Sequence, residues 1–137
     1  MFGWLVRWRD RKGVPLHGGL TLRRVKRYAA QSGYVYEYFF LGRREIRYQG
    51  ADAIEFVFEV SAGPGTGLHV SVILPMPSLE PTEASWGRKL ADNEHYAVAK
   101  MALFQAFDER LAPADMRDHV IVRTADAAAI LATLGLA

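Results

Sequence analysis

Residues 54–74 read IEFVFEVSAGPGTGLHVSVIL. Large apolar residues recur at every second position through 54–60 and again through 68–74, and a side-chain period of two is typical of half-buried strands. The segment between them is rich in glycine, which favours a connecting loop. We therefore predict a β-hairpin that pairs Val60 with Leu68. Its core face carries these residues: Ile54, Phe56, Phe58, Val60, Leu68, Val70, Val72 and Leu74.

The hairpin is preceded by a second region with strand character. Residues 34–41 read YVYEYFFL, and aromatic and β-branched residues favour strands. Gly42 and Arg43 come next, and a glycine in the first of two such positions predicts a two-residue turn. Residues 44–48 would then return antiparallel.

The second half of the chain has helical periodicity. Pro75 and Pro77 end the sheet region, because proline cannot continue the hydrogen bonding of a central strand. We expect the following elements after them: a short helix over 83–90, a long helix over 92–107 capped by Asp92, a strand over 120–122, and a helix over 125–134 capped by Thr124. Consecutive strands followed by helices predict an α+β fold, with an antiparallel sheet of four to five strands and helices packed on one face.

The N-terminal region differs from the rest in composition. Residues 1–19 read as an arm in which Trp4 and Trp8 lie one helical turn apart among arginines, and residues 20–137 form the single domain. Residues 20–28 fit an edge strand or a short helix, and we favour the strand. Tryptophan with arginine is typical of interfacial membrane anchors. For so short a segment we instead expect the two indoles to dock on the domain or on a second subunit.

Length and composition exclude several classes of protein. A chain of 137 residues can bury a core without disulfides or structural metal. The absence of cysteine excludes disulfide scaffolds, zinc ribbons, thiol nucleophiles and iron–sulfur sites. No apolar run approaches the ~20 residues of a transmembrane helix, and arginines interrupt the region where a secretory signal would lie. We expect a cytoplasmic protein.

Charge is distributed unevenly along the chain. Residues 1–48 carry eleven Arg or Lys against three Asp or Glu, whereas the remainder carries six against twelve. An anionic partner for the basic N-terminal third would explain this division. Attraction between the two halves, within one fold or across a dimer, would also explain it, and we favour this second explanation.

One pair of side chains in the predicted hairpin could support catalysis. Antiparallel pairing places Glu59 opposite His69, with Glu55 on the same face, away from the core. A carboxylate beside an imidazole can position a general base, and Glu37 would join them if its strand presents that face. The catalytic candidates are thus Glu59, His69, Glu37 and Glu55. A solvated charge pair on an exposed sheet face is the commoner arrangement, and no recognised metal or cofactor motif is present.

A nucleic-acid-binding sheet is another alternative. Residues 33–38 read GYVYEY and resemble the aromatic strand of an RNA-recognition motif. The chain departs from that motif because Ser32 replaces its basic residue and the βαββαβ order is absent. Binding of RNA or single-stranded DNA would use these residues: Tyr36, Tyr38, Arg43, Arg44 and Arg47. Tyrosines in such a pattern are more often part of a core or a dimer interface.

Our leading interpretation is a small binding or assembly module that forms a homodimer. The strand over 34–41 and the long helix are apolar on two sides, and large exposed apolar surfaces are typical of interaction sites. A monomer would have to cover these residues unaided: Val35, Phe39, Leu41, Met101 and Phe104.

Overall fold

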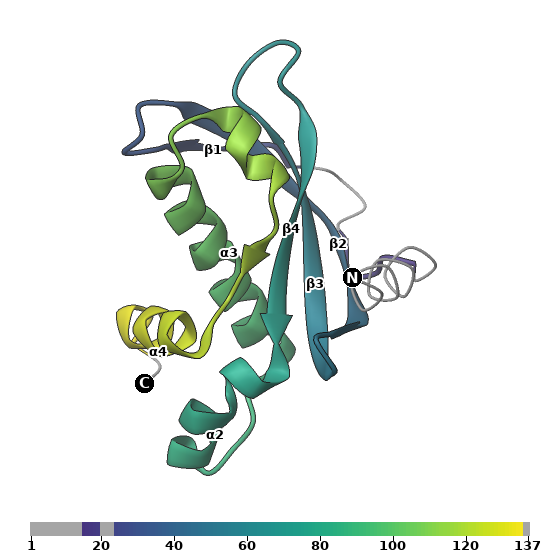
Figure 1. Ribbon diagram of the computed structural model, residues 1–137, viewed down its shortest axis with the longest axis vertical. Coiled ribbons are helices and arrows are strands. Elements are labelled where there is room, and N and C mark those ends of the chain that lie inside the picture. Colours follow the sequence, from purple (N-terminus) through teal and green to yellow (C-terminus); the bar gives the residue numbers. More distant parts are fainter. Residues whose placement is uncertain (1–14, 20–23, 136–137) are drawn as a thin grey trace.

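The computed structural model describes residues 15–19 and 24–135. They form an α+β fold, as predicted, with five strands in the order β1-β2-β3-β4-β5. In chain order the elements are β1 (Lys26–Ala29), β2 (Val35–Tyr48), β3 (Ala51–Ser61), β4 (Leu68–Pro75), η1 (Met76–Ser78), α2 (Glu80–Trp86), α3 (Asp92–Glu109), η2 (Pro113–Arg117), β5 (Val120–Ile121) and α4 (Thr124–Thr133). The helices α3 and α4 lie on the same side of the sheet (Figure 1).

The hairpin of β3 and β4 has the predicted register. Val60 pairs with Leu68, and Glu59 pairs with His69. Strands β1 to β4 pair antiparallel, whereas β5 pairs parallel with β4 at the sheet edge. The alternating pattern was sufficient for this register because a shift by one residue would turn Phe56 and Phe58 toward the opposite face.

The predicted turn at Gly42 and Arg43 is wrong. Strand β2 continues through both residues to Tyr48, and its register against β3 shifts between Phe40 and Gly42. Gly42 has φ 148°, a conformation suited to glycine, and therefore forms a β-bulge in place of a turn. A Cβ on Gly42 would lie 2.9 Å from the Leu16 Cβ and 3.0 Å from the His17 carbonyl oxygen.

The bulge exchanges the side-chain directions of β2. Before it, Tyr38 pairs with Val60 and lies on the face that packs against the helices, which we call the helix face. After it, Arg44 pairs with Glu55, and both lie on the opposite face, which we call the second face. The long strand thus contributes aromatic residues to the core at one end. At its other end it contributes Arg44 to the second face, together with Ile46, which packs with Ala53 and Ile73 in a smaller apolar cluster.

The helix boundaries differ from those predicted in two ways. Helix α2 spans Glu80–Trp86, whereas 83–90 was predicted. It begins before Pro81, because proline is tolerated in the first turn, and ends where Gly87 takes φ 71°. The predicted caps Asp92 and Thr124 lie inside their helices, since the capping positions are Ala91 and Arg123. At each helix start a carboxylate three residues further on accepts the backbone N–H of the capping residue.

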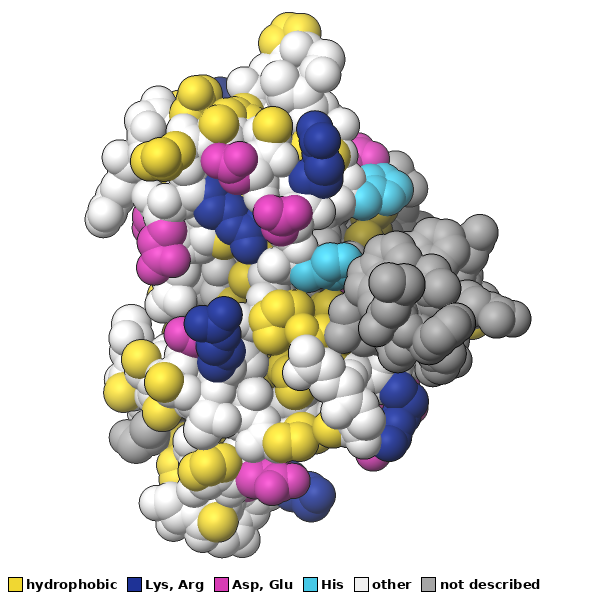
Figure 2. Space-filling model, viewed as in Figure 1, with side chains coloured by type: hydrophobic (Ala, Val, Ile, Leu, Met, Phe, Trp, Pro, Cys, Tyr) yellow, Lys and Arg dark blue, Asp and Glu magenta, His cyan; other side chains and the backbone are white. Residues whose placement is uncertain are grey.

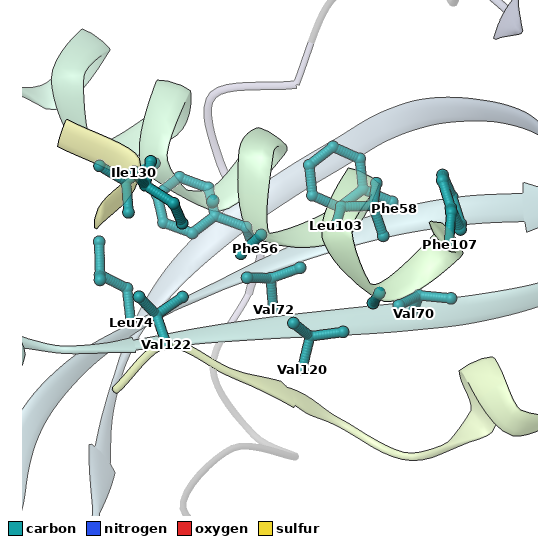
Figure 3. Close-up of a cluster of buried hydrophobic side chains, with 14 of the residues drawn as sticks. Phe56, Phe58, Val70, Val72, Leu74, Leu103, Phe107, Val120, Val122 and Ile130 are labelled. Atoms are coloured by element: carbon teal, nitrogen blue, oxygen red, sulfur yellow. The ribbon is translucent and has the colours of Figure 1, made fainter. Parts of the chain in front are cut away.

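The core fills the space between the sheet and the two helices (Figure 3). Phe56 and Phe58 of β3 are fully buried, as are Leu103 and Phe107 of α3 and Ile130 of α4. Burial of each such side chain stabilises the fold by about 1.5 to 3 kcal/mol. These side chains hold α3 and α4 on the helix face.

The second apolar side of α3 is covered from within the chain. Strand β1 and the start of β2 curl over the C-terminal half of α3 (Figure 1). The ring of Tyr28 stacks on Phe104 with centroids 4.3 Å apart, and Tyr36 stacks on Phe107 at 4.1 Å. Phe104 therefore does not require a partner subunit, whereas Val35 remains 54% exposed.

Part of the predicted N-terminal arm lies along the sheet. The backbone of His17 pairs with Arg43 through hydrogen bonds of 2.8 and 2.7 Å, on the edge of β2 beyond its pairing with β1. Residues 1–14, with Trp4 and Trp8, lie outside the described residues.

Candidate functional site

The predicted pair of Glu59 and His69 lies on the second face. Their Oε1 and Nε2 atoms are 3.3 Å apart, and the two side chains are 41% and 65% exposed. Glu37 lies on the same face and approaches Arg27 at 4.0 Å. The pair is open to solvent, so its catalytic role stays a prediction.

Glu55 has a different environment. It is fully buried, and its carboxylate accepts hydrogen bonds from Arg44 Nε at 2.8 Å and Ser71 Oγ at 2.5 Å. Four residues along a strand separate it from Glu59 by about 13 Å. The structure therefore does not bring Glu55 together with the exposed pair, and places it in a buried ion pair between β2 and β3.

The predicted base-stacking tyrosines are part of the core. Tyr36 is 0% exposed and Tyr38 is 5% exposed, because both lie on the helix face beneath α3. Their ring faces are therefore not open to a base. The sequence pattern also allowed the commoner arrangement, in which such tyrosines are buried in a core, and the structure shows this arrangement for Tyr36 and Tyr38.

The three predicted phosphate-contacting arginines each hold a carboxylate. They form these ion pairs: Arg43 with Asp92 at 2.8 Å, Arg44 with Glu55 at 2.8 Å, and Arg47 with Asp52 at 2.7 Å. All three carboxylates come from the acidic part of the chain beyond residue 48. Attraction between the two halves within one fold thus accounts for part of the uneven charge distribution.

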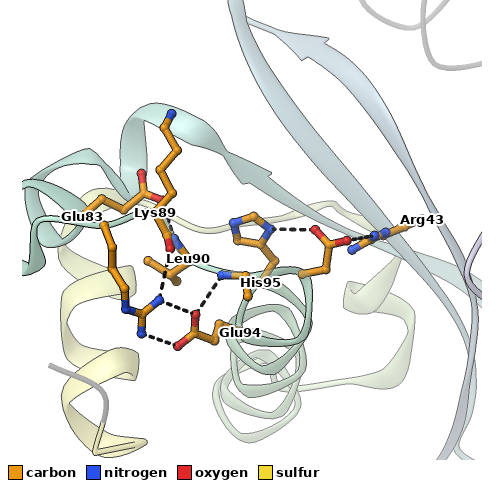
Figure 4. Close-up of polar contacts among 9 residues, drawn as sticks. Arg43, Glu83, Lys89, Leu90, Glu94 and His95 are labelled. Atoms are coloured by element: carbon orange, nitrogen blue, oxygen red, sulfur yellow. Dashed lines mark hydrogen bonds and ion pairs between the residues drawn. The ribbon is translucent and has the colours of Figure 1, made fainter.

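A polar network surrounds the start of α3 (Figure 4). Glu94 accepts two hydrogen bonds from Arg88, each 2.9 Å, and one from the Ala91 backbone at 2.8 Å. The bonds from Arg88, followed by the bond from Ala91, lower the pKa of Glu94 to about 2. Glu83 accepts the Leu90 N–H at 2.8 Å, which ties α2 to the loop before α3.

His95 occupies an unusual position beside this network. Its side chain is 12% exposed, and its Nδ1 lies 4.0 Å from Asp92 Oδ1. Nδ1 is buried and forms no hydrogen bond within the part of the chain that the structure describes. Burial lowers the pKa of His95, although Asp92 and Glu83 oppose this effect. The network serves to join helix and strand, with Arg43 and Asp92 as the link between β2 and α3.

A pair of lysines that sequence reasoning missed converges at the other end of the helix face. Lys26 of β1 pairs in register with Tyr38, and Lys100 of α3 places Nζ 6.0 Å from the Tyr38 ring centroid and 5.8 Å from that of Phe104. Burial lowers the pKa of Lys100, and the charge and side-chain contact of Lys26 lower it further. Two ammonium groups therefore share one site above aromatic rings.

The lysine pair lacks a carboxylate partner within residues 15–19 and 24–135, where ion pairs form elsewhere. Asp108, on the same helix, accepts hydrogen bonds from Tyr28 Oη at 2.7 Å and Gln31 N at 2.9 Å. The face in Figure 2 shows cations and carboxylates side by side. The lysine site differs because like charges meet there.

Two hollows lined by described residues lie away from the predicted catalytic pair. One of about 280 Å³ lies between α3, β5 and α4 and is lined by Gln105, Glu109, Arg110, His119 and Asp126, among others. The guanidinium of Arg110 there donates hydrogen bonds to the carbonyls of Asp115, Asp118 and His119. These bonds hold the segment around η2 against the end of α3. Another hollow, of about 480 Å³, lies beside Tyr48, Pro77 and Thr124.

Metal ligands do not gather in the part of the chain that the structure describes, where no three His, Asp or Glu side chains could hold an ion together. None of the described helices combines the length and hydropathy needed to cross a membrane. The chain matches no protein-family model, curated protein or solved structure.

Proposed function

We propose that this protein is a binding module for an anionic partner, and that Lys26 and Lys100 form its binding site. The observation that carries the proposal is the position of two lysines around Tyr38. Lys100 lies over its ring and Lys26 is its strand partner, and neither lysine has a carboxylate partner among the described residues. Arg24, two residues before Lys26, is exposed and adds positive charge beside them.

The internal ion pairs narrow the choice of surface. Arg43, Arg44 and Arg47 are used within the fold, so they support the sheet and leave little charge for a partner. Arg27 of β1 approaches Glu37, whereas Lys26 and Lys100 have no carboxylate partner among the described residues. A bound anion would relieve the repulsion between the two ammonium groups.

Heparin retention tests the proposal with a general polyanion. We expect the wild-type protein to be retained at low salt and released as salt rises, because screening weakens charge attraction. A Lys26→Gln/Lys100→Gln double variant should elute at distinctly lower salt. The matched control is Lys89→Gln/Arg117→Gln, which removes the same charge from exposed positions elsewhere. Flow-through of the wild type, or an equal loss in the control, would contradict the proposal.

Self-association is a second proposal, with exposed apolar residues as its support. Val25 and Val35 are 55% and 54% exposed at the β1–β2 end of the sheet. Surface valines of this kind can form the centre of a contact between two copies. The mass in solution, measured by light scattering, tests whether two copies associate.

A further inference from the structure

We infer that the anionic group taken by Lys26 and Lys100 is a dianionic phosphoryl group, as in a phosphate monoester; this inference rests on the proposed function. The two lysines come from elements 74 residues apart in the chain and are brought together by the curl of β1 and β2 over α3 (Figure 1). The site is therefore a product of the tertiary fold.

The position of Lys100 is defined by aromatic rings. Its Nζ lies near the faces of Tyr38 and Phe104, and Phe104 is held by its stack on Tyr28. Cation–π attraction favours this placement of the ammonium. A restrained side chain loses less conformational freedom when a ligand binds.

The charge of the site favours a dianion. Lys26 and Lys100 bring two positive charges to the same side of Tyr38, and a carboxylate supplies only one negative charge. A phosphate monoester carries between −1.5 and −2 charges at about pH 7. It can accept hydrogen bonds from both lysines through separate oxygens.

The donor geometry points in the same direction. An arginine fork matches the planar oxygens of a carboxylate, whereas lysine acts as a compact charge with three rotatable donors. The site presents two lysines, and its floor consists of rings that offer no competing carboxylate. This arrangement suits a tetrahedral oxyanion better than a planar one.

Proton uptake gives an independent readout of binding. Lys26 of β1, Tyr38 of β2 and Tyr96 of α3 are the titratable groups recorded around this site. Burial and Lys26 lower the pKa of Lys100, and a bound dianion would raise it again because opposite charge favours the protonated form. Binding at alkaline pH should therefore take up protons from the buffer.

Calorimetric titration with phenyl phosphate and with benzoate tests the assignment. We expect phenyl phosphate to bind the wild type about tenfold more tightly than benzoate, and Lys100→Gln to lose about tenfold in affinity for phenyl phosphate. Lys89→Gln should leave the affinity unchanged. Repeating the titration in two buffers of different ionisation enthalpy should reveal the proton uptake in the wild type alone.

Lys26→Gln provides a second variant on an exposed strand edge, should Lys100→Gln impair folding. Vesicles containing phosphatidic acid, compared with phosphatidylcholine vesicles, distinguish a lipid headgroup from a free phosphate ester, and either source supports the phosphoryl assignment. Equal affinity for phenyl phosphate and benzoate would overturn the inference while heparin retention kept the proposed function. If the protein showed neither a preference for phenyl phosphate nor retention on heparin, the phosphoryl assignment and the proposed function would both be rejected.

Discussion

The hydroxyl of Tyr36 is buried in the core and has no hydrogen-bond partner among the described residues, and its ring stacks on Phe107. A buried polar group left unpaired costs about 1 to 3 kcal/mol. The aromatic ring therefore stabilises the core while its hydroxyl opposes that gain. Burial, with smaller contributions from Tyr34 and Asp115, raises the pKa of this hydroxyl, so it remains protonated at neutral pH.

Replacing Tyr36 with phenylalanine should stabilise the protein. We expect Tyr36→Phe to raise the free energy of unfolding by up to about 1 kcal/mol, measured by urea denaturation. Tyr28→Phe is the matched control, since Tyr28 donates its hydroxyl to Asp108 and should lose about 1 kcal/mol. A loss of stability in Tyr36→Phe as large as that of the control would show that the hydroxyl is satisfied.

Because burial lowers the pKa of His95, we expect the free energy of unfolding to decrease toward acid pH. Its folded pKa lies below the ordinary value of 6.5, so the unfolded chain binds a proton more readily. The stability that neutral His95 confers is therefore present above pH 6.5 and is lost as pH falls below it, by at most about 1.4 kcal/mol per pH unit. Unfolding curves between pH 7.5 and 5.5 should show this slope.

A glutamine at position 95 should flatten that pH dependence, because the titrating group is gone. His69→Gln is the control, since His69 is an exposed histidine on the second face, and it should keep the slope of the wild type. An unchanged slope in His95→Gln would assign the pH dependence to another group.

At the scale of elements, the bulge at Gly42 decides how β2 is used. Its positive φ and the close approach of Leu16 and His17 leave no room for a side chain. We expect Gly42→Ala to destabilise the fold by about 1 to 3 kcal/mol from backbone strain, with the steric clash in addition. Gly67→Ala, where no neighbour lies within 4 Å of the added Cβ, should change stability by less than about 0.5 kcal/mol. Equal effects in urea denaturation would contradict the role of the bulge.

The contrast between β3–β4 and β2 shows how far the sequence could predict the sheet. Alternation through Phe56 and Phe58 is a local pattern and specified the hairpin to the residue. Gly42 has the local pattern of a turn, but the backbone of the next residue, Arg43, pairs with the distant His17. Pairing across that distance has no periodic signal, and so the turn was predicted where a bulge exists.

The candidate sites follow the same rule. The contact between Glu59 and His69 came directly from the hairpin register. The contact between Lys26 and Lys100 depends on how β1 pairs with β2 and on where α3 crosses the sheet. The pairing of β1 with β2 and the position of α3 on the sheet could not be obtained from spacing along the chain. In the sequence, Lys100 is a single polar position on an otherwise apolar helix.

At the scale of the whole molecule, charge and apolar surface have separate explanations. Arg43, Arg44 and Arg47 pair with carboxylates from beyond residue 48, so the fold neutralises part of its own charge asymmetry. The cations left at β1 lie on an edge strand, where positive charge also discourages pairing between sheet edges. A second copy of the chain would therefore associate more readily through exposed valines than through the edge of β1.

The exposed valines at the β1–β2 end of the sheet predict a dimer. We expect light scattering at micromolar concentration to give a mass of about twice 15.3 kDa for the wild type and close to the single-chain mass for Val35→Ser, because burial of an exposed valine contributes about 1.5 to 3 kcal/mol. Leu111→Ser is the control, since Leu111 is 84% exposed in the loop after α3, and it should leave the dimer intact. A single-chain mass for the wild type would contradict self-association, and the exposed valines would then be ordinary surface residues.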